Sequence, residues 1–131
     1  MVEPISRLPL GLAAFFGATG VMAGAFGAHA LRDLVTPDRL AVWQTAAQYQ
    51  LLHAVVLLAL SIWIMVSPTT LGRWALRCFV VGIFLFSGSL YLLVLTDLRW
   101  FGAITPVGGG LLIVAWGMLL LGAMRKDTRI D

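Results

Sequence analysis

Residues 40–72 read LAVWQTAAQYQLLHAVVLLALSIWIMVSPTTLG, a run of 33 residues without Asp, Glu, Lys or Arg. An ionised side chain at the centre of a bilayer is costly, so a run of this kind indicates a membrane-spanning segment. About 20 helical residues cross a hydrocarbon core of about 30 Å, and this run is longer than that. Because lipid offers no partner for backbone polar groups, we expect the crossing to be an α-helix.

Three further stretches between charged residues are equally apolar. They lie between Arg7 and Arg32, between Arg77 and Asp97, and between Arg99 and Arg125. Four crossings account for most of the chain. The sequence therefore predicts a single all-α domain, an integral membrane four-helix bundle with spans at about residues 8–30, 46–66, 72–95 and 103–124.

The composition excludes a soluble globule. Of the 131 residues, 60% are hydrophobic and 11% are charged, whereas a soluble domain carries about 25% charged residues. A chain of this length still exposes a large share of its surface, so it cannot bury that many apolar side chains in water. We expect its main surroundings to be the lipid bilayer.

Two Thr-Pro pairs predict helix starts. In Thr36-Pro37-Asp38, the threonine suits the N-cap, proline suits the first helical position, and the acid faces the positive end of the helix dipole. The mixed polar and apolar residues that follow predict an interfacial extension of the second helix before it enters the membrane. Thr105-Pro106 repeats the pair and predicts the start of the fourth helix.

The basic side chains lie at the ends of the spans and predict the orientation. One side of the membrane receives both termini and the middle connection, with Arg7, Arg73, Arg77, Arg125, Lys126 and Arg129. The other side receives Arg32, Arg39 and Arg99. An excess of basic residues in short loops marks the cytoplasmic side, so we expect both termini in the cytoplasm. The basic residues form no stripe or face, so nucleic acid is not an expected partner.

The first span carries a stripe of small residues. Its glycines fall with Ala13 within an arc of about 80° on a helix, and they are Gly17, Gly20, Gly24 and Gly27. Stripes of this kind let two membrane helices approach closely, within one chain or between chains. The favoured hypothesis is a non-enzymatic accessory or scaffold subunit, which joins other membrane chains or a second copy of itself through this face.

Polar side chains within the spans are predicted to gather in the external half of the membrane. They are His29, Tyr49, Gln50, His53, Ser87, Ser89, Tyr91 and Thr105. One interpretation is hydrogen bonding between helices, which is common in membrane bundles. The alternative is an externally facing pocket around His29 and His53 that binds a quinone, a lipid head group, or a metal ion or haem. Two histidines without a cysteine or an intramembrane carboxylate are an incomplete metal set, and no cofactor is assigned.

Catalysis finds no support in the residue pattern. Asp33, Asp38 and Asp97 are all placed in loops or at helix starts, where capping explains them. Ser87 and Ser89 point about 200° apart on a helix, with no acid at their depth to complete a triad. We therefore expect no enzyme.

Four motifs in order carry a resemblance to a known family. They are Gly24-Ala25-Phe26-Gly27-Ala28-His29-Ala30-Leu31; Thr45 with Tyr49-Gln50 and His53; Phe86-Ser87-Gly88-Ser89-Leu90-Tyr91; and Thr105-Pro106 with Gly108-Gly109. The chain resembles the domain-of-unknown-function-423 family, small multi-span proteins of bacterial inner membranes with transmembrane-256-like relatives in eukaryotes. The match runs from about Gly11 to Gly122. It implies that the eight polar residues above occupy motif positions, and it implies no activity, because none is established for the family.

Overall fold

The computed structural model describes residues 6–125 and consists of four long helices. They are α1 (Leu8–His29), α2 (Pro37–Val66), α3 (Thr70–Thr96) and α4 (Phe101–Met124), with a short 3₁₀ helix, η1 (Leu31–Asp33), between α1 and α2. Each long helix has the length and hydropathy needed to cross a membrane, and no strand occurs among the described residues. The predicted all-α fold with four spans is confirmed.

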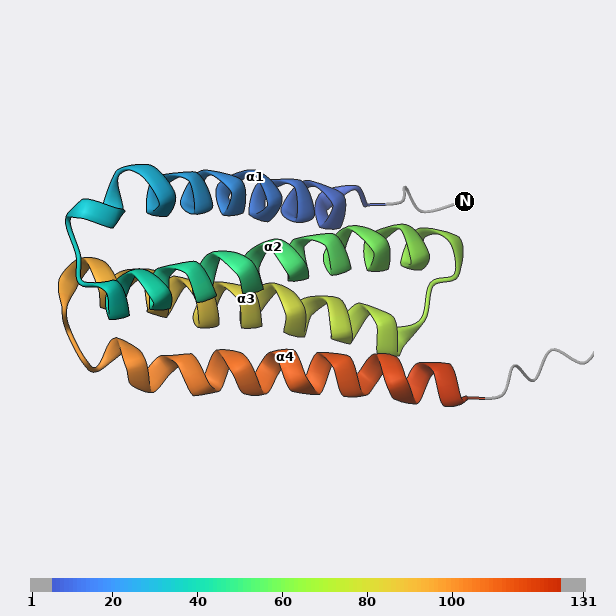
Figure 1. The fold of residues 1–131 in the computed structure, drawn as a ribbon. Helices are drawn as coiled ribbons and strands as arrows, with labels where there is room; N and C mark the ends of the chain where they lie inside the picture. Colours follow the sequence, from blue (N-terminus) through green and yellow to red (C-terminus); the bar gives the residue numbers. More distant parts are fainter. Residues whose placement is uncertain (1–5, 126–131) are drawn as a thin grey trace, which may run out of the picture.

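The helices follow one another in an up-and-down arrangement (Figure 1). Each packs mainly against its neighbour in the chain, α1 against α2, α2 against α3 and α3 against α4. Helices α1 and α4 lie on opposite sides of the α2–α3 pair (Figure 1). Helix α1 begins and α4 ends at one end of the molecule, which we call the terminal end; the α1–α2 and α3–α4 connections lie at the opposite end.

The predicted start of α2 is confirmed. Thr36 is the N-cap, its side chain accepts a hydrogen bond from the backbone N–H of Arg39 at 3.4 Å, and Pro37 is the first helical residue. Helix α2 continues without interruption to Val66, so the expected interfacial extension and the span are one helix.

The predicted start of α4 at Thr105 is wrong, because the helix begins at Phe101. The backbone N–H groups of residues 101–103 already bond to carbonyl groups three residues earlier, so a helical turn precedes the Thr-Pro pair. Pro106 consequently lies inside the helix, where it lacks the N–H of one backbone hydrogen bond.

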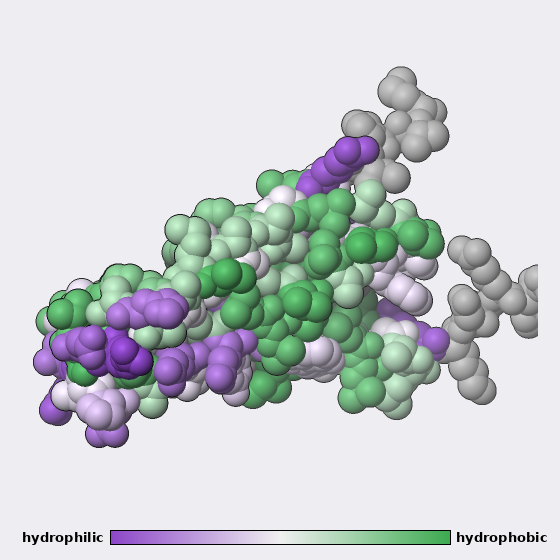
Figure 2. Space-filling view, turned by 45° about the horizontal axis from the view of Figure 1, so that its top comes forward, coloured by the Kyte–Doolittle hydropathy of each residue, from purple (hydrophilic) through white to green (hydrophobic). Residues whose placement is uncertain are grey.

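Apolar side chains fill the interior of the molecule and also cover the middle of its surface. Phe79, Leu57 and Ile83 are among the most deeply buried. Figure 2 shows hydrophobic side chains over the middle of one face, with hydrophilic ones concentrated toward the ends. Many large apolar side chains are exposed, among them Phe15, Val55 and Phe84. This distribution is that of a protein in contact with lipid.

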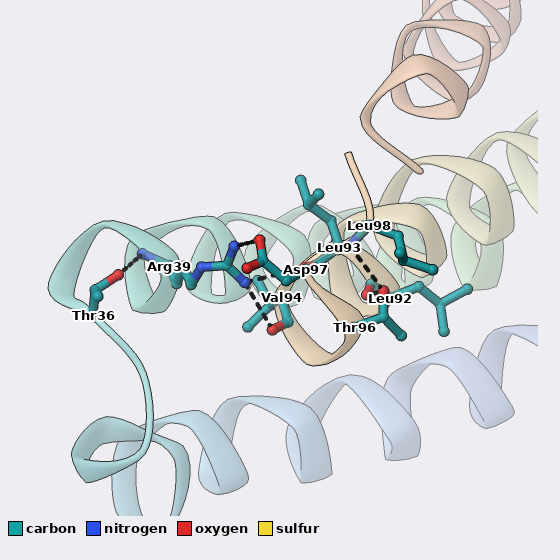
Figure 3. Close-up of polar contacts among 8 residues, drawn as sticks. All are labelled: Thr36, Arg39, Leu92, Leu93, Val94, Thr96, Asp97 and Leu98. Carbon is teal, nitrogen blue, oxygen red and sulfur yellow. Dashed lines mark hydrogen bonds and ion pairs between the residues drawn. The ribbon is translucent and has the colours of Figure 1, made fainter. Parts of the chain in front are cut away.

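At the opposite end, Arg39 joins α2 to the end of α3 (Figure 3). Its guanidinium group pairs with Asp97 and donates to the backbone oxygens of Val94 at 3.2 Å and Leu93 at 3.4 Å. Asp97 ends α3 in a left-handed conformation, with φ of 59°. Asp97 therefore lies in the connection after α3, where it ends that helix and holds Arg39.

The two ends differ in charge balance. The opposite end carries three arginines and three aspartates, including the pairs Arg39–Asp97 and Arg32–Asp33. The terminal end carries arginines without any acidic residue in the described part of the chain; they are Arg7, Arg73, Arg77 and Arg125. Lys126 and Arg129, which are also predicted to lie on this side, are outside the described residues.

Candidate functional site

Gln50 lies at the centre of a polar cluster between helices. Its side chain is 5% exposed, and its Nε2 donates to the backbone oxygen of Phe16 at 2.9 Å and to Oγ1 of Thr19 at 2.7 Å. Its Oε1 accepts a hydrogen bond from the hydroxyl of Tyr91 at 2.8 Å. One amide group of α2 therefore binds α1 on one side and α3 on the other.

Two serines of α3 extend the cluster. Ser87 donates from Oγ to the backbone oxygen of Ala46 on α2 at 2.8 Å. The hydroxyls of Ser89 and Thr105 lie 2.7 Å apart and link α3 to α4. The structure thus brings together Gln50 with Tyr91, and Ser89 with Thr105, from the residues predicted by sequence.

His53 is buried, with 4% of its surface exposed, and both its ring nitrogens have partners. Trp116 of α4 donates from Nε1 to Nε2 of His53 at 3.2 Å, and Nδ1 lies 2.8 Å from the backbone oxygen of Tyr49. An indole N–H only donates, so Nε2 accepts and Nδ1 carries the proton. If Nε2 of His53 bound a metal ion or a haem iron, that bond would have to replace the hydrogen bond from Trp116. Tyr49 itself is partly exposed beside the ring of Phe86.

His29 does not join this cluster. It is exposed at the last position of α1, two residues beyond Gly27, which packs against Trp43 near the start of α2. His53 lies ten residues further along α2 than Trp43, about 15 Å at 1.5 Å per residue. The prediction of a pocket shared by His29 and His53 is therefore wrong, since α2 carries His53 well below the end of α1.

The described buried polar side chains are all hydrogen bonded within the chain. Nor does the described part contain a group of three or more His, Cys, Asp or Glu residues placed to hold a metal ion. Membrane helices commonly use such internal bonds to hold their neighbours. The geometry of the cluster is that of contacts between helices.

The glycine stripe of α1 is divided between two faces. A Cβ added to Gly20 would lie 2.9 Å from Cδ2 of Leu51, and one added to Gly27 would lie 2.6 Å from Cδ1 of Trp43. These two glycines allow the close approach of α2. A Cβ added to Gly17 or Gly24 would meet no atom within 4 Å. Half of the predicted packing surface is thus used inside the chain.

Sequence reasoning missed three contributors to these contacts. Thr19 lies in an apolar run, and a threonine at this position, among glycines, was the available signal for a polar contact. Trp43 donates from Nε1 to the backbone oxygen of Ala23 at 2.8 Å. Trp116 binds His53. Tryptophan in membrane proteins is usually found at the water interface, which gives no hint of a partner within the bundle.

The fold and the cluster define a small multi-pass membrane protein whose polar residues join its helices. The chain belongs to the family described as "Protein of unknown function (DUF423)", which matches residues 23–109. A "UPF0382 membrane protein" of Staphylococcus saprophyticus is 44% identical over 116 residues, 87% of this chain and 94% of the relative. The "UPF0382 inner membrane protein YgdD" of Escherichia coli is 37% identical over 124 residues, 95% of each chain. No solved structure matches significantly. The resemblance found in the sequence is confirmed, and so is the location in a bacterial inner membrane.

Proposed function

We propose that this protein is a non-enzymatic accessory or scaffold subunit, which associates with a second copy or another membrane chain through the open face of α1. The observation that carries the proposal is the unoccupied space at Gly17 and Gly24. The two residues are seven positions apart and therefore lie on the same face of the helix. Small residues at such spacing let a second helix approach closely in lipid.

The position of α1 in the fold supports this role. Helix α1 packs mainly against α2 and lies at one side of the molecule, away from α4 (Figure 1). Val21 is 61% exposed and lies between Gly17 and Gly24 in sequence, about 40° from Gly17 around the helix. A partner helix therefore has access to a shallow strip of backbone beside an apolar side chain.

The polar cluster supports a structural role rather than a catalytic one. Gln50, Ser87 and His53 are engaged with groups of neighbouring helices. A catalytic site needs a nucleophile, acid or base that can reach a substrate. The hydrogen bonds of these side chains are instead directed at the protein itself.

Cross-linking in native membranes tests the proposal. A photoreactive amino acid at Val21 is expected to yield a cross-linked product of defined mass, either a dimer of this chain or a complex with one partner. Substituting both Gly17→Leu and Gly24→Leu should remove that product, because leucine fills the strip. Gly11→Leu is the matched control, since Gly11 is also open but lies about 220–240° around the helix from the other two. A monomer in the wild type, or a product unchanged by the double substitution, would refute the role.

A further inference from the structure

A groove opens at the terminal end between the first turns of α1, the last turns of α2 and the first half of α3. Its volume is about 660 Å³, within the range of ligand sites. Apolar side chains form most of its wall, including Leu10, Leu12, Ile64, Met65, Leu76 and Val80. The buried residues of α1 begin only at Ala13, so the turns before it leave this space open. The groove is separate from the Gly17–Gly24 face.

Two arginines of α3 line the same groove. Arg73 and Arg77 are one helical turn apart, and both are exposed. Like charges at this spacing repel each other, and an anion between them would relieve the repulsion. The described part of the terminal end contains no carboxylate that could do so. The guanidinium group of Arg77 lies 4.8 Å from the ring centre of Trp74, a residue type found at membrane interfaces.

The combination of two arginines and an apolar wall fits one class of ligand. A phosphodiester accepts paired hydrogen bonds from guanidinium groups, and its single negative charge would lie between the two arginines. The apolar wall beyond the arginines fits a hydrocarbon chain. A second groove at this end, about 820 Å³ between α2, α3 and α4, has Arg125 as its single cation among the described lining residues. It therefore offers weaker charge complementarity.

We propose that the groove between α1, α2 and α3 binds one anionic phospholipid, with its phosphate group on Arg73 and Arg77 and an acyl chain along Leu10, Ile64 and Val80. The lipid belongs to the leaflet at the terminal end. It fills the space that the first turns of α1 leave open, and it supplies the negative charge that the described protein surface lacks there.

Native mass spectrometry of the delipidated full chain, titrated with phosphatidylglycerol or phosphatidylcholine, tests the proposal. The wild type should bind the first phosphatidylglycerol at least about fivefold more tightly than phosphatidylcholine, since one basic residue near an anionic lipid contributes about that factor. Arg73→Gln with Arg77→Gln should abolish the preference. Arg125→Gln, the control at the same end, should retain it.

A second variant separates a built site from general charge attraction. Leu10→Trp keeps both arginines and fills the groove, so it should weaken the first phosphatidylglycerol binding step by about fivefold or more, in line with the loss of buried apolar contact. Equal affinity of the wild type for both lipids would overturn the proposal. So would an equal loss in Arg125→Gln, or unchanged binding in Leu10→Trp. None of these outcomes depends on whether Val21 cross-links to a partner.

Discussion

The hydroxyl of Tyr91 donates a hydrogen bond to Oε1 of Gln50, with 2.8 Å between the two atoms. The nitrogen of the same amide bonds to α1. Tyr91 therefore fixes the direction of the amide, because the oxygen must face α3 for the nitrogen to face α1. Three helices depend on this one orientation.

Tyr91→Phe should destabilise the protein by about 1 kcal/mol, since it removes a hydrogen bond between helices and leaves Oε1 of Gln50 without its partner. Reversible unfolding in bicelles with added SDS measures the change. Tyr49→Phe is the control, because Tyr49 is partly exposed and its hydroxyl has no hydrogen bond among the described residues. It should stay within about 0.5 kcal/mol of wild type. Equal effects of the two substitutions would contradict the role of Tyr91.

Gly108→Ala should separate α3 from α4. A Cβ at this position would lie 2.3 Å from the backbone nitrogen of Phe86, which cannot move without its helix. We expect a loss of about 1–3 kcal/mol, the usual range for overpacking. Gly110→Ala has open space and should change stability by less than about 0.5 kcal/mol. The same unfolding assay compares the two, and a neutral Gly108→Ala would show that the helices are further apart than described.

Asp97 combines a charge with an unusual backbone conformation, and two substitutions separate these contributions. Asp97→Asn removes the charge that pairs with Arg39 but tolerates the left-handed conformation, so we expect a loss of up to about 1 kcal/mol, because the carboxylate of this pair is largely exposed. Asp97→Val should cost about 1–2 kcal/mol more, because a β-branched residue strains at positive φ. Thermal unfolding in detergent distinguishes them. Indistinguishable variants would mean that the conformation of residue 97 is unimportant.

Both termini are expected in the cytoplasm, because the terminal end carries the unbalanced arginines. A green fluorescent protein fused after residue 131 should fluoresce, and alkaline phosphatase at the same site should be inactive. Alkaline phosphatase inserted after Asp33, in the connection between α1 and α2, should be active. The reverse pattern of activities would place the terminal end outside.

The sequence was sufficient to predict the four helices, because uncharged runs of this length have one stable form in lipid. Thr36 and Pro37 also located the start of α2, because the side chain of Thr36 and the ring of Pro37 act on the adjacent backbone. The start of α4 was missed because Trp100, its N-cap residue, makes no side-chain cap bond that a sequence pattern could reveal.

The candidate site was predictable by residue type but not by pairing. Depth along a span follows from counting residues, and it placed Gln50 and Tyr91 near each other. Which side chains meet depends on the rotation and offset of whole helices, and these decide that His53 bonds to Trp116 rather than sharing a pocket with His29. The division of the glycine stripe has the same origin. A rotation of about 60° separates Gly20, against α2, from Gly17, which is open.

The packing of each helix against its predecessor bears on how the chain is made. As a ribosome feeds the segments into the membrane in order, each segment after the first finds the preceding helix, against which it packs, already inserted. The first hairpin has its close contacts at Gly20 and Gly27 before α3 is synthesised. Assembly needs no long-range search, which favours rapid folding during synthesis.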